Sequence, residues 1–303
     1  MAGIITTGSF PKLLWPGIKE VWGGVYRAYA PECFEIFDKE MSSQAYEEDV
    51  GITGMGLAPV KNQGEAISYD DLKQNFVTRY THVAYALGFI VTHEEMEDNL
   101  YRKVSSIKAE SLARSMYLTK ETIGANVLNN GFDASFAGGD GVELFSLVHP
   151  IEGGTFSNKL AIDADLSEAS LEQAVIDISS FVDQRGNKIK IMPKKLIIPK
   201  ELQFEAKRIL DNPVQANTAE RNINALYQFG SIPEGFRINH YLTDPDAWFI
   251  ITDCPTGMKH YQRQAPTLKD DSDFETFNAK FSAYERYSFG WTDPRGIFAS
   301  QGG

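Results

Sequence analysis

One segment constrains the fold of this chain more than any other, a helical pattern that extends from residue 92 to residue 130. Thr92 and Glu95 form a capping box, in which each side chain accepts a hydrogen bond from the other residue's amide. Apolar residues then recur at steps of three and four: Met96, Leu100, Val104, Ile107, Leu112, Met116, Ile123 and Val127. Gly131 is predicted to end the helix as a left-handed cap. At about 1.5 Å per residue, the helix would be a rod of roughly 55 Å, so the fold must offer an equally long surface.

The clearest strand pattern lies near the C-terminus. Every second residue between 277 and 291 is apolar, with the single exception of Glu285. This alternation predicts one long, half-buried strand. Between the two elements, residues 160–268 mix helical and strand patterns, with a helix after Ser167. Strands are expected at 188–192, 194–199, 236–242 and 248–252. The fold class predicted is therefore α+β.

The first 80 residues consist of two segments that are not expected to form a core by themselves. Residues 1–45 contain scattered aromatics, Phe10, Trp15 and Trp22 among them, without a helical or strand period, and are interpreted as an extended arm with short helical pieces. Residues 46–80 are polar, rich in glycine and partly alternating, which predicts a long two-stranded hairpin. Such a hairpin is marginal alone, so both segments are expected to rest on another surface.

Charge and composition exclude several classes of protein. The formal net charge of −12 disfavours sequence-independent binding to a phosphate backbone. No apolar run approaches the roughly 20 residues that cross a bilayer, and the N-terminus has no export-signal pattern. The two cysteines, Cys33 and Cys254, are interpreted as reduced thiols. We therefore expect a folded protein that is neither a membrane protein nor a nucleic-acid enzyme.

No motif in the sequence predicts catalysis. None of the five histidines lies in an HExxH pair or at zinc-ligand spacing to a cysteine. The segment 138–141 (GGDG) lacks the Gly-Lys-Ser/Thr ending of a phosphate loop, and the acidic runs at 163–165 and 270–273 fit solvated turns better than calcium loops. The lysines of residues 188–195 fit a solvated strand face or a salt-bridge surface between subunits. We predict no catalytic, cofactor-binding or metal-binding residue, and no enzyme.

The order of these segments resembles the major capsid proteins of tailed bacteriophages with the Hong Kong 97-like fold. The resemblance lies in an aromatic arm, a long polar hairpin, a very long capped helix, a mixed α/β middle and a closing strand. Local sequence carries it too, at residues 80–101, 112–133, 140–158, 165–175 and 274–300. It covers nearly the whole chain.

The resemblance implies a division of the chain into domains. The parts would be an N-terminal arm (1–45), an E-loop (46–88), a peripheral domain (89–159) containing the spine helix (92–130), an axial domain (160–268) and a return to the peripheral domain (269–303). The implied function is a structural subunit that self-assembles into the icosahedral head shell around phage DNA. The chain would have no cofactor, would not contact a membrane and would enclose DNA without reading its sequence. Its location would be the virion capsid, after assembly in the host cytoplasm.

The resemblance also implies partners and contact residues. Copies would meet as pentamers and hexamers, together with a portal and, in some members, a decoration or cement protein. Because the arm follows the first Met directly, a separate scaffolding protein is expected. Candidate interface residues are Lys61, Asn62, Gln63, Glu65 and Tyr69 in the E-loop and Phe10, Trp15 and Trp22 in the arm. Cross-linking of neighbours through Lys61 or Lys73 is not expected.

Two other interpretations remain open at this stage. An encapsulin-type nanocompartment shell protein shares the fold but encloses cargo enzymes, and in that family the N-terminus forms a helix that lines a cargo pocket. A soluble α/β enzyme with an unrecognised active site is the alternative from a different class. Monomeric behaviour with turnover of a substrate would favour the enzyme.

Overall fold

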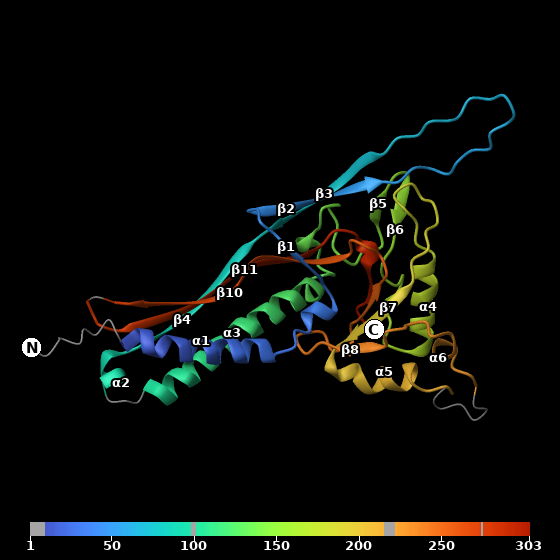
Figure 1. Ribbon diagram of the computed structural model, residues 1–303. Helices are drawn as coiled ribbons and strands as arrows, with labels where there is room; N and C mark the ends of the chain where they lie inside the picture. The colour runs from blue at the N-terminus through green and yellow to red at the C-terminus, as the bar shows by residue number, and fades with distance from the viewer. Residues whose placement is uncertain (1–9, 98–100, 215–221, 274) are drawn as a thin grey trace, which may run out of the picture.

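Two four-stranded sheets organise the chain in the computed structural model (Figure 1). The structure describes residues 10–97, 101–214, 222–273 and 275–303, and the side chains among them outside 10–17 and 96–104. Among the described helices, none has both the length and the apolar character that a bilayer span requires. The predicted α+β class is confirmed.

The first sheet, called the long sheet here, has the strand order β1-β10-β11-β4. Its strands are β1 (Asp38–Met41), β10 (Met258–Ser272), β11 (Ala279–Trp291) and β4 (Val83–Val91). β11 pairs antiparallel with both β10 and β4, whereas β1 pairs parallel with β10. The predicted C-terminal strand is confirmed as β11. The predicted solvated turn at 270–273 is wrong for residues 270–272, because they continue β10.

Two helices cover one face of the long sheet, α1 (Phe10–Ala28) and α3 (Tyr101–Asn129) (Figure 1). Their shared core with the sheet consists of Ile18, Trp22, Ala109, Leu112, Ala113, Met116, Leu268, Ala279, Phe281 and Ala283. The prediction of an extended N-terminal arm is therefore wrong for residues 10–28. Pro16 and the pair Gly23-Gly24 obscure the helical pattern there, and packing against α3 overrides their low helix propensity.

The predicted capping box is confirmed at the start of α2 (His93–Glu97). The amide of Thr92 donates to Oε2 of Glu95, and the amide of Glu95 donates to Oγ1 of Thr92, both at 3.2 Å. The segment predicted as one helix, 92–130, contains two described helices, α2 and α3. Residues 98–100 between them lie outside the described part. Along α3, the buried stripe contains Leu112 and Met116 as predicted, but Ile107 is 55% exposed.

Gly131 does not form the predicted left-handed cap, because its φ is not among the positive values of the chain. A close approach explains the glycine instead. A Cβ at this position would lie 2.5 Å from Cε2 of Phe145, a buried ring of the core behind α3. Packing, and not a left-handed backbone conformation, thus explains the glycine just beyond the end of α3.

The second sheet, called the short sheet here, has the strand order β12-β9-β7-β8. Its strands are β12 (Ile297–Ser300), β9 (Trp248–Thr252), β7 (Pro193–Ile198) and β8 (Phe236–Ile238). Both faces are buried, because successive side chains enter different cores. Trp248 and Ile250 face a core with α4 (Glu168–Ser179), α5 (Gln203–Leu210) and α6 (Ala225–Phe229), whereas Phe249 faces the core behind α3. Of the predicted strands, 188–192 is not one.

Strand membership does not follow the predicted boundary between residues 268 and 269. That boundary falls inside β10 of the long sheet, and β12, expected to return to the peripheral domain, pairs with β9 of the short sheet. Smaller elements complete the fold: the pair β5 (His149–Ile151) and β6 (Gly154–Phe156), and single helical turns at Cys33–Glu35, Ala134–Phe136, Lys200–Leu202 and Pro294–Gly296.

Candidate functional site: the projecting hairpin and its base

The most conspicuous surface feature is a hairpin formed by β2 (Tyr46–Thr53) and β3 (Lys73–Thr81), which pair antiparallel. The hairpin extends away from the two sheets, and residues 54–72, called the hairpin loop here, form its far end (Figure 1). Large apolar side chains in this loop are mostly open to solvent: Met55, Leu57, Val60, Ile67, Tyr69 and Leu72. Tyr69 is 90% and Val60 89% exposed. Exposed apolar groups that gather on one projection are typical of an interaction site.

The structure places the five candidate residues of the E-loop within the hairpin loop. Asn62 and Glu65 lie together in a turn: the amide and the Nδ2 of Asn62 donate to Oε2 of Glu65, at 3.1 and 3.0 Å. Lys61, Gln63 and Tyr69 are exposed, and within the described chain no side-chain hydrogen bond joins them to that turn. The turn therefore holds the tip in shape while its neighbours stay available for contact.

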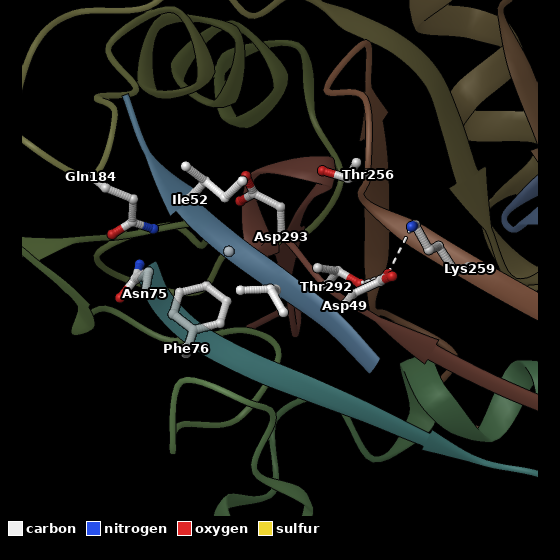
Figure 2. Close-up of a pocket in the computed structure, with 11 residues that line it drawn as sticks. Asp49, Ile52, Asn75, Phe76, Gln184, Thr256, Lys259, Thr292 and Asp293 are labelled. Carbon is white, nitrogen blue, oxygen red and sulfur yellow. Dashed lines mark hydrogen bonds and ion pairs between the residues drawn. The ribbon is translucent and has the colours of Figure 1, made fainter. Parts of the chain in front are cut away.

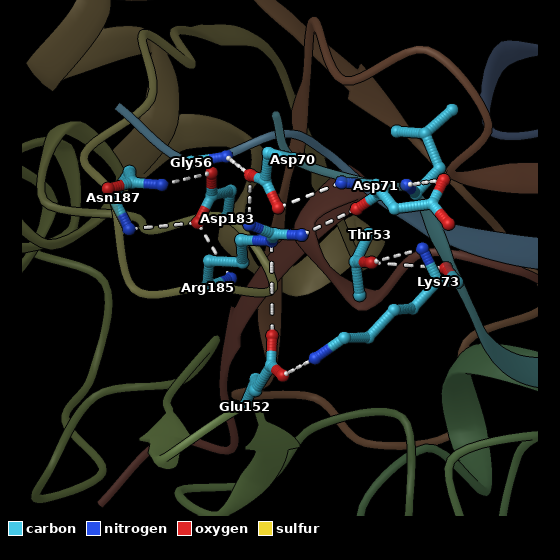
Figure 3. A network of polar contacts seen from close by, with 10 residues as sticks. Thr53, Gly56, Asp70, Asp71, Lys73, Glu152, Asp183, Arg185 and Asn187 are labelled. Carbon is cyan, nitrogen blue, oxygen red and sulfur yellow. Dashed lines mark hydrogen bonds and ion pairs between the residues drawn. The ribbon is translucent and has the colours of Figure 1, made fainter. Parts of the chain in front are cut away.

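An ionic network attaches the hairpin loop to the rest of the chain at its base (Figure 3). Arg185 donates from Nη1 to Oδ2 of Asp70 at 2.5 Å and from Nη2 to the carbonyl oxygen of Asp71 at 2.7 Å. Its Nε also lies 3.9 Å from Oε2 of Glu152, whose Oε1 is 2.5 Å from Nζ of Lys73. One guanidinium thus holds the β3 side of the hairpin loop, through Asp70 directly and through Glu152 and Lys73 indirectly.

A tight turn orients Arg185 for this role. Oδ1 of Asp183 accepts from the amides of Arg185 and Asn187, each at 2.8 Å, and Oδ2 accepts from Nδ2 of Asn187 at 3.0 Å. On the hairpin side, the amide of Gly56 donates to Asp70 at 2.8 Å. That amide and then the Arg185 guanidinium lower the pKa of Asp70 to about 2, so the carboxylate is charged at neutral pH.

A second attachment lies deeper, along a cleft of about 300 Å³ between β2, β3 and the ends of β10 and β11 (Figure 2). Asp49 of β2 lies there 2.7 Å from Nζ of Lys259, and it accepts from Oγ1 of Thr292 at 2.7 Å and from the Tyr261 hydroxyl at 3.1 Å. Burial opposes ionisation of Asp49, but these hydrogen bonds and the Lys259 charge outweigh it, so its pKa is below the usual range. The hairpin stem is therefore fixed to the long sheet.

Of the three candidate residues of the arm, the structure describes the side chain of Trp22 alone. The side chains of Phe10 and Trp15 lie outside the described part of the structure. Trp22 is only 7% exposed and stacks on Tyr26 at a centroid distance of 5.5 Å, within the core between α1, α3 and the long sheet. Its own chain therefore covers almost all of its surface.

A buried ion pair joins these helices to the sheet. Lys120 of α3 contacts Glu285 of β11, and their side chains are 5% and 0% exposed. Glu285 also accepts from the Tyr26 hydroxyl of α1 at 3.1 Å and from Nε2 of Gln262 of β10 at 2.8 Å. The exception in the apolar pattern of β11 thus has its charge and hydrogen bonds satisfied inside the core.

The remaining polar clusters have structural contacts. His149 lies 2.7 Å from Asp140 through Nδ1 and 3.1 Å from Asn158 through Nε2, and the pair is enclosed, with both side chains 1% exposed. Within the described residues, no group of three His, Cys, Asp or Glu side chains is arranged to hold a metal ion. Lys195, part of the predicted basic strip, is buried and contacts Glu35 and Glu234 of its own chain at 2.7 and 3.2 Å.

Several solved structures share this fold. The chain superposes on the virus-like particle from Pyrococcus furiosus (10% identity, 93% of this chain and 97% of that chain, TM-score 0.53). It also superposes on the procapsid of bacteriophage JBD30 (11% identity, 96% and 75%, TM-score 0.54) and on the capsid of the empty GTA particle (11% identity, 88% and 87%, TM-score 0.53). The fold is Hong Kong 97-like.

Sequence comparison then identifies the family. The family model described as phage capsid protein matches residues 75–300, and the chain belongs to that family. It is a major capsid protein, a structural subunit of a virion shell. A search of curated protein sequences gives no significant match.

No pattern in the sequence predicts the network at the base of the hairpin. Arg185 and Asp70 are 115 positions apart, and neither lies in a recognisable motif. The only local signal is the Asp-Gln-Arg-Gly-Asn segment at 183–187, whose composition is typical of a turn.

Proposed function

We propose that copies of this chain associate as pentamers and hexamers in an icosahedral head shell, with the hairpin of one copy lying on its neighbour. The observation that carries the proposal is the exposure of the hairpin loop. Six large apolar side chains project from the molecule, and the described residues of the same chain leave them largely uncovered. A neighbouring copy that covers them would bury apolar area at about 25 cal/mol per Å².

The ionic network at the base supports the same role. Arg185, Asp70 and Glu152 hold the loop in one direction before any neighbour is present. A segment that is already oriented loses less conformational freedom when it binds, which favours association.

The acidic composition supports enclosure of DNA without adhesion to it. A net charge of −12 gives the shell the same sign as the phosphate backbone, so packaged DNA would be repelled from the wall unless a local basic patch intervened. Scaffolding, portal and decoration proteins are proposed partners on the basis of the family alone, as are assembly in the host cytoplasm and the lack of any enzymatic activity.

An encapsulin-type nanocompartment shell protein, which would share this fold, is the second candidate. The two kinds of shell differ in what they enclose: a phage head encloses nucleic acid, and a nanocompartment encloses protein cargo.

Electron microscopy of the purified chain, expressed with and without a scaffolding protein, tests the proposal. We expect closed shells, tubes or capsomer rings, and nucleic acid inside shells isolated from infected cells. A chain that stays monomeric under every condition would contradict the proposal, and shells filled with a protein cargo would favour the nanocompartment.

A further inference from the structure

Strand β4 forms an unprotected edge of the long sheet. Its sequence over residues 83–91, VAYALGFIV, has no charged residue and no proline. The other edge strand, β1, has three charged residues in four, and β2 of the hairpin contains Glu47, Glu48 and Asp49. Charged side chains and proline are the usual protection of an edge against pairing with another chain. The chain protects those two strands and leaves β4 open.

Among the described residues, no strand pairs with the outer side of β4, so its backbone groups there are open to another chain. A Cβ on Gly88 would lie 2.6 Å from the carbonyl oxygen of Phe281. The backbone N–H and C=O groups of the odd-numbered residues of β11 therefore point toward β4. The Thr267 hydroxyl approaches the carbonyl of Tyr284 at 3.3 Å, which places the even-numbered residues of β11 toward β10. The backbone N–H and C=O groups of the odd-numbered residues of β4 therefore bond to β11. Those of the even-numbered residues point away from β11, toward the open edge.

These outward residues are Ala84, Ala86, Gly88 and Ile90. Across the described part of the chain, the carbonyl of Ile90 accepts from Nζ of Lys108 at 3.1 Å, and no backbone bond satisfies the other outward groups. Side chains leave the edge accessible, since Val83 and Leu87 are each 48% exposed and Ile90 is 49% exposed. A nine-residue apolar edge of this kind is a template for another strand.

The sequence of β4 is nearly the same when read in either direction from Leu87. Antiparallel pairing of two copies about this residue would place Val83 opposite Val91. The same register would set Tyr85 against Phe89 and Ala86 against Gly88. Aromatic pairs, β-branched pairs and small pairs are favourable cross-strand neighbours, and no like charges would meet. The register also brings outward residues together, 84 opposite 90 and 86 opposite 88, as hydrogen bonding requires.

We propose that β4 of one copy pairs antiparallel with β4 of a second copy, across a two-fold axis through Leu87. The contact joins two long sheets into one eight-stranded sheet. It deepens the proposed function, since it specifies where two subunits of the shell meet. A two-fold contact requires a surface that complements itself, and β4 meets this requirement in sequence, in backbone direction and in charge. An uncharged strand offers no such match to the acidic edge of β2 or to the charged β1.

Disulfide trapping tests the register directly. In the proposed pairing, the two Leu87 residues face each other with Cα atoms about 4.5 Å apart, within the range of a disulfide. Assembled Leu87→Cys chains, oxidised and run without reductant, are expected to form a covalent dimer. Ile90→Cys is the matched control, because its exposure is nearly equal but its two copies would lie about 20 Å apart. It should give no more dimer than the parent chain with Cys33 and Cys254.

A mixture of Ala84→Cys and Ile90→Cys chains should again form the dimer, because these positions face each other in the same register. Shells that form without a Leu87→Cys dimer would overturn the pairing and leave the proposed function intact. A covalent product with a scaffolding or accessory protein would also overturn it. If the parent chain forms no shell, the proposed function fails. In that case, absence of the Leu87→Cys dimer in a concentrated solution of the soluble chain would overturn the pairing as well.

Ala86→Pro provides an independent test. Its amide points away from β11, so proline removes no hydrogen bond within the subunit but blocks the outer edge. We expect an unchanged circular dichroism spectrum and denaturation midpoint together with loss of assembly. Assembly at the parent level would contradict the proposal.

Discussion

At the scale of single residues, His260 shows how burial sets a dependence on pH. The ring is 0% exposed, contacts Phe34 and Phe289, and has no hydrogen-bond partner at either nitrogen among the described residues. Burial first, and then the charges of Lys120 and Lys39, lower the pKa of His260 to about 3. The folded chain therefore keeps this histidine neutral in mild acid, whereas the unfolded chain takes up a proton near pH 6.5.

The free energy of unfolding should consequently decrease as the pH falls from about 6.5 toward 3, by up to about 1.4 kcal/mol per pH unit from this residue. His260→Phe is expected to remove this part of the slope and to raise stability at pH 7 by about 1 kcal/mol, because two unpartnered polar atoms are lost. Urea denaturation at several pH values measures both effects. His240→Phe, at a residue with a 59% exposed side chain, serves as the control, and an unchanged slope for His260→Phe would refute the assignment.

The buried pair of Lys120 and Glu285 makes a second prediction at this scale. Lys120→Met leaves the Glu285 carboxylate uncompensated in the core and should lower the free energy of unfolding by about 3–5 kcal/mol. Adding Glu285→Gln removes the charge and should restore part of that loss. Lys194→Met, at a solvent-screened pair with Glu234, should change stability by less than about 1 kcal/mol. Equal effects at the two lysines in denaturation experiments would contradict the prediction.

At the scale of elements, the hairpin depends on a contact with a distant turn. Arg185→Ala removes the bonds to Asp70 and Asp71 and should loosen the hairpin loop. Lys61 lies in that loop, so trypsin should cleave after it faster than in the parent chain. Arg208→Ala, at a surface pair within α5, is the matched control. Equal cleavage rates in both variants would mean that Arg185 does not hold the loop.

The sequence predicts those elements whose pattern is local. The alternation of residues 277–291 predicts β11, and the Thr92–Glu95 pair predicts the capping box, because each signal lies within a few residues. The helix α1 was missed because Pro16 and two glycines oppose it and only packing against α3 favours it. Much of β10 was missed as well, since its polar half, including Lys269 and Asp271, gains strand structure only from the pairing with β11.

The candidate site was predictable only in part for the same reason. A glycine-rich polar segment with isolated apolar residues indicates an exposed hairpin, but nothing local in the sequence relates Asp70 to Arg185 or Asp49 to Lys259. These pairs exist because the fold brings separate segments together, and long-range ion pairs leave no periodic pattern.

At the scale of the whole molecule, folding and assembly should be separable. The hairpin loop contributes no residue to the three described cores, so replacing residues 57–68 by a short Gly-Ser linker should leave the subunit folded. The same change should abolish shells, because it removes Leu57, Val60 and Ile67, half of the six apolar side chains proposed to bind the neighbour. Circular dichroism and denaturation report on the fold, and electron microscopy on the shells. Normal shells from this variant would exclude a role of the loop in assembly.

Strand β12 has a consequence for the order of events during synthesis. Ile297 and Phe298 are fully buried and pair with β9, so the short sheet lacks one of its strands until residues 297–300 have been translated. Since a chain emerges from the ribosome N-terminus first, β7, β8 and β9 emerge before the strand that completes their sheet. A prematurely terminated polypeptide would expose both neighbouring cores and be open to proteolysis, so incomplete products would be removed before they could enter a growing shell.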